Sequence, residues 1–353
     1  MSERMVIETV DVHAAGEPGR IITNMGHLVK GDTMAQRFAY ATKELNWLRH
    51  TVLREPRGYP AMCAAMVMPP VTPEADFGMI VLEQANFTAM SGSNTMCTVT
   101  AVLETGIVPM QEPITKVVID TAVGQIHVTA ECKAGKVVSV SIDNVPAWVV
   151  ELDRIIDVPE YGKIPVDIIF GGQFFAQTDI SNVGLEVDPN RGKEITRAGA
   201  AIKAAINAEL TLTHPENPTL TYVNLVLMHN GDRAPGKQAR NATVLTSGEP
   251  DLKNTATWAG TLDRSPCGTG TSARMAGLYA RGQLSVDEPF SHKSILDTEF
   301  IGTIRGETEY FEMPAILPTI KGPAWVTGTA KWTVDPTDPF QNGYRLTDIW
   351  AAE

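Results

Sequence analysis

The expected fold follows from two similar stretches of sequence, Ser91-Gly92-Ser93-Asn94-Thr95 and Cys267-Gly268-Thr269-Gly270-Thr271. Each is a polar, glycine-bearing loop that leads into a run of small and apolar residues, which is typical of a buried helix. The fourth residue of each loop is Asn or Gly, and both types tolerate unusual backbone angles. Gly106 and Gly282 follow at equal distances from the starts of their loops, and the loops are offset by about half of the chain. This register predicts two halves built on one plan.

The rest of the chain predicts a β-rich protein with few helices. Short runs rich in β-branched residues and bounded by turn residues predict strands, for example at 117–120, 125–130, 137–142, 166–170 and 222–228. Helical periodicity is confined to 33–48, 95–105, 191–208 and 271–281. We therefore expect an α+β fold of two pseudo-symmetric domains, each a barrel-like sheet around one central helix. A chance likeness of the two loops is the alternative, because the halves show no other obvious identity at this offset.

Three prolines, Pro146, Pro159 and Pro165, interrupt the strand pattern and predict a boundary between the halves. The expected N-terminal half is 1–165, completed by 340–353, and it carries Ser91. The expected C-terminal half is 166–339, and it carries Asp263 and Cys267.

The charge and the apolar pattern exclude several classes of partner. The 353 residues contain 29 Lys and Arg against 41 Asp and Glu, a net charge of −12. Such a chain repels phosphate backbones and anionic lipid, so nucleic acid is not an expected partner. The longest apolar runs, such as 223–228, are far too short to span a bilayer. The N-terminus alternates apolar and charged residues and lacks the pattern of a secretory leader, so the expected location is the cytoplasm.

Cysteine and histidine usage predicts neither a disulfide framework nor a metal site. The four cysteines, at 63, 97, 132 and 267, form no C-x-x-C pair, and the seven histidines show no ligand spacing. Cys63, Cys97 and Cys132 are interpreted as core residues. The glycine-rich stretches match neither the phosphate-loop nor the dinucleotide-binding pattern, so no cofactor is expected.

Two helix starts that carry Ser91 and Cys267 suggest a specific chemistry. A helix N-terminus presents unpaired N–H groups and a partial positive charge, which attract an anion and lower the pKa of a thiol placed there. Two such ends that face each other would bind a carboxylate and place one side chain on each side of its carrier. This geometry suits the movement of a proton at the carbon next to a carboxylate.

The segment 262–273, Leu-Asp-Arg-Ser-Pro-Cys-Gly-Thr-Gly-Thr-Ser-Ala, resembles the C-terminal catalytic motif of the proline racemase family. The resemblance extends from residue 6 to about 345 and includes further landmarks in family order: Asp11-Val-His13, Gly16-Glu17-Pro18, Glu55-Pro56-Arg57-Gly58, Met90-Ser91-Gly92, Gly171-Gly172 with Phe174, and Ala239-Arg240-Asn241. It implies a diaminopimelate epimerase-like fold with the active site in the cleft between the halves, a hydroxyproline substrate and no cofactor. A monomer and a homodimer both remain open.

The resemblance also implies the catalytic pair. Two cysteines of the family act on opposite faces of a proline ring, and the matching positions here are Ser91 and Cys267. Ser93 stands where the family motif has histidine, which leaves room near a ring hydroxyl. Serine first and cysteine second resembles the subtype that dehydrates trans-3-hydroxy-L-proline and also epimerises trans-4-hydroxy-L-proline at C2. Which of the two groups removes the proton is left open.

The resemblance implies further site residues, each by its position in the family motif. Asp263 matches the family residue that pairs with the ring nitrogen, with a turn cap as the alternative. The expected carboxylate-binding residues are Gly92, Ser93, Gly268 and Thr269. Both a substrate contact and a structural role remain open for His13 and His229, as do a ring contact and a core position for Phe174.

Two other functions compete with this interpretation. One is a cysteine-dependent hydrolase or transferase with Cys267 as nucleophile. The other is a non-catalytic binding protein of the same fold, which Ser91 and Ser93 keep open.

Overall fold

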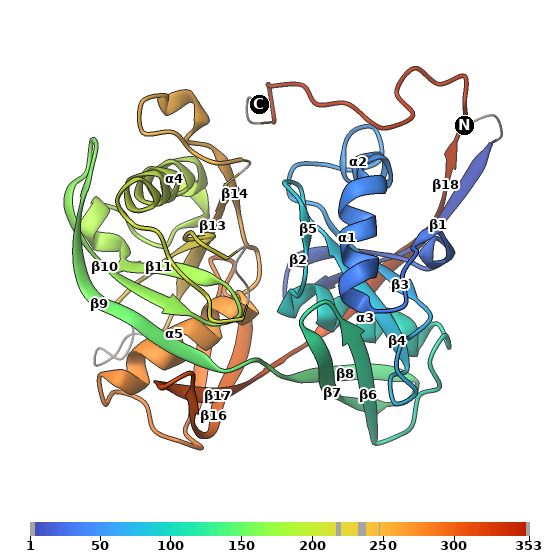
Figure 1. The fold of residues 1–353 in the computed structure, drawn as a ribbon, viewed down its shortest axis with the longest axis horizontal. Helices are drawn as coiled ribbons and strands as arrows, with labels where there is room; N and C mark the ends of the chain where they lie inside the picture. The colour runs from blue at the N-terminus through green and yellow to red at the C-terminus, as the bar shows by residue number, and fades with distance from the viewer. Residues whose placement is uncertain (1–3, 217–219, 232–237, 247, 351–353) are drawn as a thin grey trace. The chain divides into compact units, whose positions relative to one another are not determined.

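The computed structural model describes residues 4–216, 220–231, 238–246 and 248–350, which form two compact units. Unit 1 comprises the described residues of 1–142 together with 321–350, and unit 2 comprises those of 143–320. Each unit combines β-strands with helices packed against them (Figure 1). The expected α+β fold of two sheet-rich domains is confirmed.

In unit 1 the sheet is built around strands from both ends of the chain. β1 (Met5–Ala14) pairs antiparallel with β2 (Glu17–Ile22) and with β18 (Ala324–Val334). β2 runs parallel to β3 (Cys63–Met68), which pairs with β4 (Phe77–Leu82). The pairing continues through β5 (Phe87–Thr88), β6 (Ile114–Thr121), β7 (Gly124–Lys133) and β8 (Lys136–Asp143). Two helices, α1 (Met34–Glu44) and α2 (Asn46–Leu53), cover an apolar cluster against this sheet.

The buried helix of unit 1 is α3 (Gly92–Glu104), which packs against β1, β2, β3 and β18. Its approach to β2 is close, because a Cβ on Gly19 would lie 2.8 Å from Cβ of Cys97. Two of the threonines of α3 satisfy their hydroxyl groups on carbonyls one turn earlier: Oγ1 of Thr95 donates to the carbonyl of Ser91 at 2.8 Å, and Oγ1 of Thr98 to that of Asn94 at 2.7 Å. A polar-looking sequence can therefore form the centre of this unit.

In unit 2 the hairpin of β9 (Ala147–Val158) and β10 (Gly162–Phe170) continues into β11 (Phe174–Asp179). β11 runs parallel to β12 (Leu225–His229), which pairs with β13 (Asn241–Thr246) and through it with β14 (Gly260–Leu262). β15 (Pro289–Lys293) pairs with β16 (Glu299–Tyr310), and β17 (Met313–Gly322) pairs with β9. The described part of unit 2 also has three 3-10 helices, η2 (Ile180–Val183), η3 (Pro189–Arg191) and η4 (Thr255–Thr257), and unit 1 has η1 (Gly26–Leu28).

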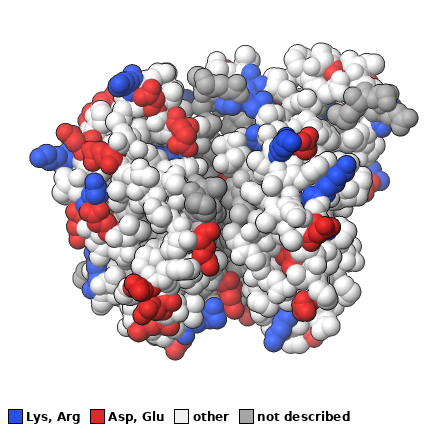
Figure 2. Space-filling model, viewed as in Figure 1, with Lys and Arg blue, Asp and Glu red and all other residues white. Residues whose placement is uncertain are grey.

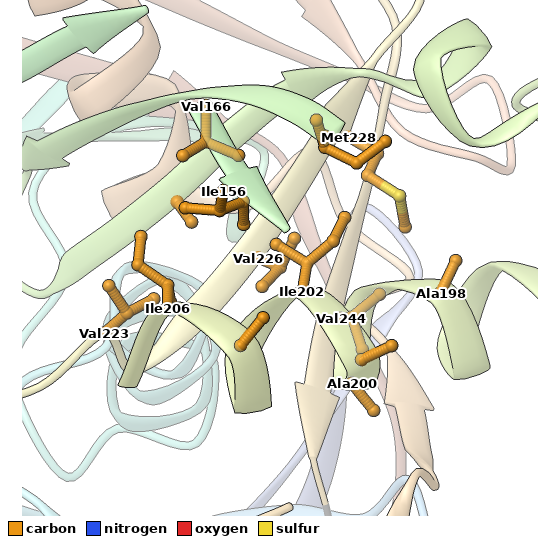
Figure 3. Packing of buried hydrophobic residues seen from close by; sticks show 14 of the residues in the cluster. Ile156, Val166, Ala198, Ala200, Ile202, Ile206, Val223, Val226, Met228 and Val244 are labelled. Atoms are coloured by element: carbon orange, nitrogen blue, oxygen red, sulfur yellow. The ribbon is translucent and has the colours of Figure 1, made fainter. Parts of the chain in front are cut away.

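Two helices lie against this second sheet. α4 (Gly192–Glu209) packs its apolar side on β12 and β13, where Ile202 and Ile206 belong to one buried cluster with Val223, Val226 and Val244 (Figure 3). α5 (Gly268–Ala280) packs against β9, β10, β11 and β16, and its residues from Gly268 to Leu278 are all buried. Thus α5 is the counterpart in unit 2 of α3 in unit 1.

The borders of the units differ from those expected from the prolines. Pro165 lies inside β10, where it is paired with Ile155 of β9, so both strands belong to unit 2. Residues 321–350, rather than 340–353 alone, return to unit 1 because β18 pairs with β1 along most of its length. The helix expected at 33–48 is divided into α1 and α2 at Leu45.

Charged side chains of both signs are interspersed over the face shown in Figure 2, without a continuous basic patch on that face. None of the helices in the described parts of the chain combines the length and the apolar character needed to span a bilayer.

Candidate active site

Ser91 is the residue that caps the N-terminus of α3. Its backbone is extended, with φ −147° and ψ 127°, and its carbonyl accepts the first helical hydrogen bond, from the N–H of Thr95 at 2.9 Å. Its hydroxyl oxygen accepts a hydrogen bond from Nδ2 of Asn94 at 3.1 Å and lies 3.4 Å from Oγ of Ser93. Gly92 and Ser93 form the first turn, where helical N–H groups have no partner within the helix. The unit thus presents a hydroxyl group beside an electropositive helix start.

Cys267 has the matching position at the start of α5. It is 4% exposed and has φ 64° and ψ 106°, a left-handed backbone that is uncommon for a residue with a side chain. Its N–H donates to Oγ of Ser265 at 3.2 Å, and its carbonyl accepts from the N–H of Thr271 at 2.7 Å. The thiol lies 3.9 Å from Oγ1 of Thr269. A Cβ at Gly270 would lie 2.9 Å from the sulfur, so this position requires glycine.

The thiol of Cys267 is protonated at neutral pH. Burial raises its pKa well above the ordinary value, and the negative charge of Asp263 raises it further. The N–H of Gly270 and the hydroxyl of Thr269 oppose this shift. The sequence analysis expected the helix start to lower the pKa of a thiol, and the shift at Cys267 has the opposite direction, because burial and Asp263 outweigh the hydrogen bonds from Gly270 and Thr269. The sulfur therefore holds a proton that it can donate.

Asp263 follows β14 and is 8% exposed. Its N–H donates to the carbonyl of Thr243 at 2.8 Å. One carboxylate oxygen, Oδ1, accepts from both the N–H and the hydroxyl of Ser265, each at 2.8 Å. The hydroxyl oxygen of Ser265 in turn accepts a hydrogen bond from the N–H of Cys267. Asp263 is thus a turn cap and also an electrostatic neighbour of the thiol.

A glycine turn lies against the start of α5. A Cβ on Gly171 would come within 2.4 Å of the Thr269 carbonyl oxygen and 2.5 Å of the Ala273 nitrogen. Asn144, which the sequence analysis did not identify, donates from Nδ2 to the Gly171 carbonyl and to Oγ of Ser272, both at 2.9 Å. The turn and Asn144 therefore fix the first turn of α5 from the side.

The structure brings the expected site residues together in two groups, each within its own unit. Unit 1 holds Ser91, Gly92 and Ser93 at the start of α3, and unit 2 holds Asp263, Cys267, Gly268 and Thr269 at the start of α5. Asn94 is the functional candidate that sequence reasoning missed in the first group. The sequence signal for Asn94 was its position in the loop 91–95, where only its tolerance of unusual backbone angles was considered.

The remaining candidates have structural partners. Nδ1 of His13 accepts from the N–H of Gly16 at 3.2 Å, and its ring stacks on Trp325 at 5.0 Å. Nδ1 of His229, at the end of β12, accepts from the N–H of Gly231 at 3.2 Å. Phe174 is 1% exposed and belongs to the apolar core.

Cys63, Cys97 and Cys132 are buried, as expected of core residues. Within the described residues, no group of three or more His, Cys, Asp or Glu is arranged to hold a metal ion.

Comparison with known proteins identifies the class. The sequence model of the proline racemase family matches residues 9–345, and the chain belongs to this family. Among its relatives is a 4-hydroxyproline 2-epimerase from Streptosporangium roseum, 38% identical over 98% of this chain and all of the relative. Another, of the same name, comes from Agrobacterium fabrum and is 36% identical over 100% of this chain and 99% of the relative.

A solved structure agrees with these relatives. The hydroxyproline epimerase from Agrobacterium vitis, crystallised with bound trans-4-hydroxy-L-proline, superposes with a TM-score of 0.89 at 34% identity and covers 98% of this chain and 96% of that one. A PhzF-family phenazine biosynthesis protein from Bacillus anthracis has a TM-score of 0.59 at 11% identity, over 93% of this chain and 99% of that one. That second likeness shows a shared fold alone.

Proposed function

We propose that this chain is a cofactor-independent 2-epimerase that converts trans-4-hydroxy-L-proline to cis-4-hydroxy-D-proline. We further propose that the same site dehydrates trans-3-hydroxy-L-proline to Δ1-pyrroline-2-carboxylate and water. The observation that carries the proposal is the buried thiol of Cys267, which stands at positive φ at the start of α5 and whose pKa is raised by burial. The names of the relatives and the ligand of the Agrobacterium vitis structure support the choice of hydroxyproline.

In the proposed epimerisation, Ser91 and Cys267 act on opposite faces of the ring. One accepts the proton from C2 and the other delivers a proton from behind, so the configuration inverts. The group that removes the proton in one direction supplies it in the reverse direction. A protonated Cys267 is ready for the donating role, and the carboxylate of Asp263 is suited to pair with the ring ammonium.

The carbanion that forms at C2 shares its charge with the substrate carboxylate. In the proposal, N–H groups at the starts of α3 and α5 bind this carboxylate, at Gly92 and Ser93 and at Gly268 and Thr269. Donors fixed in place before the reaction stabilise developing charge without the cost of reorientation. This stabilisation replaces the electron sink that a cofactor would supply.

The proposed dehydration needs a base on one face only. In trans-3-hydroxy-L-proline the hydroxyl is opposite the carboxylate and therefore on the same ring face as the C2 proton. One group can remove that proton and return it to the departing hydroxide, which leaves as water. The enamine that forms then tautomerises to Δ1-pyrroline-2-carboxylate. A serine in place of the first thiol supports this second activity, because elimination does not require a matched pair of thiols.

Proton exchange at C2 in deuterated water tests the proposal. NMR would follow trans-4-hydroxy-L-proline, trans-3-hydroxy-L-proline and L-proline with the wild-type chain and with Cys267→Ala. We expect the wild type to epimerise the first compound and dehydrate the second, and Cys267→Ala to lose epimerisation while it stays folded by its melting temperature. Epimerisation that survives in Cys267→Ala would contradict the two-face mechanism, and a wild type without exchange would contradict the proposed function.

A planar analogue gives an independent measurement. Pyrrole-2-carboxylate resembles the flattened carbanion, so it should bind and raise the melting temperature. It should also protect Cys267 from iodoacetamide. Protection by a thioester but not by pyrrole-2-carboxylate would favour a cysteine hydrolase instead.

A further inference from the structure

His292 on β15 forms a buried polar network with Thr271 of α5 and Asn241 of β13. Its side chain is 0% exposed. Nδ1 lies 2.9 Å from Oγ1 of Thr271, and Nε2 lies 3.1 Å from Nδ2 of Asn241. All three residues belong to unit 2, and the proposed chemistry uses none of them directly. We call these three residues the His292 network.

The hydrogen bonds of Asn241 settle the direction of the whole network. Oδ1 of Asn241 accepts from the hydroxyl of Thr243 at 3.0 Å, so Nδ2 is the donor, to the carbonyls of Pro266 at 3.0 Å and Lys293 at 3.2 Å. The two hydrogens of Nδ2 thus face three acceptors, these two carbonyls and Nε2 of His292. An amide NH2 group cannot accept a hydrogen bond, so Nε2 is the acceptor and a neutral imidazole carries its proton on Nδ1. Nδ1–H donates to Thr271, whose hydroxyl donates to the carbonyl of Pro266 at 3.2 Å.

Both arms of the network therefore end on one atom, the carbonyl oxygen of Pro266. This carbonyl belongs to the peptide that precedes Cys267, and the N–H of the same peptide is held by Oγ of Ser265. Rotation of that peptide changes φ of Cys267. A residue with a side chain stays at φ 64° only where its surroundings hold it there.

We infer that His292 is a positioning residue that fixes the direction of the Cys267 thiol through Thr271, Asn241 and the Pro266 carbonyl. The inference rests on the proposed role of Cys267. Because the network ends on the Pro266 carbonyl and none of its three residues is among the groups proposed to bind substrate, its loss should lower kcat and leave KM nearly unchanged. A reacting group displaced by about 1 Å loses up to about 100-fold in rate.

The hydroxyl of Thr271 offers the cleanest test. Thr271→Val removes this hydroxyl and keeps the shape, and Thr271→Ser keeps the hydroxyl. Thr178→Val is the matched control. Thr178 is also buried in unit 2, and its hydroxyl also donates to a proline carbonyl, that of Pro165 at 2.7 Å. Both Thr178 and Pro165 are far from Cys267 in the sequence. Epimerisation kinetics, melting temperature and the alkylation rate of the Cys267 peptide by mass spectrometry are measured for each.

We expect Thr271→Val to lower kcat about 10- to 100-fold with KM changed by less than about threefold, and Thr271→Ser to recover most of kcat. Thr178→Val should lower the melting temperature and keep kcat. The inference is overturned if Thr271→Val keeps kcat, or if Thr271→Ser is as impaired as Thr271→Val. Should Thr271→Val not fold, His292→Asn replaces it: its amide can donate to Thr271 but does not reach Asn241. A lowered kcat is again expected, and an unchanged kcat overturns the inference.

Alkylation separates this inference from the proposed function. If the wild type does not act on hydroxyproline, the proposed function fails, but the position of the thiol can still be measured. A loosened Pro266–Cys267 peptide should expose the sulfur more often, so iodoacetamide should label Cys267 faster in Thr271→Val than in Thr178→Val. Equal labelling rates in the two variants would overturn the inference.

Discussion

Asn94 donates a hydrogen bond to the hydroxyl of Ser91, with 3.1 Å between Nδ2 and Oγ. The second loop has glycine at the same position, and there the backbone N–H of Gly270 bonds to the thiol of Cys267. A serine hydroxyl holds its proton more tightly than a thiol does. A side-chain donor aimed at Oγ favours negative charge on that oxygen and so compensates in part for the difference.

Asn94→Ala should therefore lower epimerisation. Loss of one fixed donor to a developing oxyanion costs about 100-fold or more when the charge is fully formed, and we expect about a tenfold or greater fall in kcat. Asn94→Asp should be worse, because it keeps the size but adds a negative charge beside Ser91. Steady-state kinetics with trans-4-hydroxy-L-proline measures both, with Asn46→Ala on α2 as the control. Wild-type kcat in Asn94→Asp would show that ionisation of Ser91 does not limit the reaction.

Ser91→Cys restores the thiol that the family has at this position. If the weak acidity of serine limits proton transfer, the variant should epimerise trans-4-hydroxy-L-proline faster and gain proline racemase turnover. Polarimetry or exchange in deuterated water measures both substrates, and Ser93→Cys is the control that adds a thiol two residues away. Unchanged rates in Ser91→Cys would mean that the second acid or base is another group.

The two helix starts were predictable from sequence because their signals are local. The loops at 91–95 and 267–271 each combine glycine, polar residues and a following small-residue helix, and α3 and α5 begin at these loops. The pKa of Cys267 was not predictable in this way. Burial of the thiol and the approach of Asp263 depend on how α5 packs in the unit, and they reverse the expected direction of the shift.

Contacts between distant segments set the other limits of sequence reasoning. His292 reaches Thr271 and Asn241 only because β15, α5 and β13 fold together. The unit border was misplaced for a similar reason, since Pro165 sits within the β9–β10 hairpin and β18 returns to pair with β1. Prolines mark local interruptions of a strand pattern and carry no information on which strands pair.

Gly171→Ala should weaken both the fold and the site. The new Cβ would meet backbone atoms of Thr269 and Ala273, which cannot move without displacing the first turn of α5. Overpacking of this kind costs about 1–3 kcal/mol, so the free energy of unfolding and kcat should both fall. Gly306→Ala is the matched control, because a Cβ there meets nothing within 4 Å. Equal denaturation midpoints for the two variants would show that α5 yields to the added methyl group.

The raised pKa of Cys267 predicts how its reactivity depends on pH. Only the thiolate reacts with iodoacetamide, so below the folded-state pKa the labelling rate should rise about tenfold per pH unit. An ordinary cysteine levels off near pH 9, and the rate at Cys267 should still increase there, because burial and Asp263 hold its pKa higher. Asp263→Asn removes one of these two causes and should speed labelling at a fixed pH.

The raised pKa of Cys267 also affects folding stability: a folded-state pKa above the unfolded value gives stability that is complete below about pH 8.5. That stability is lost as pH rises toward the folded value, and Cys267→Ala should remove this part of the loss. A labelling rate that is constant above pH 8 would mean that the sulfur is ionised at the start of α5, and the protonated donor in the proposed mechanism would have to be abandoned.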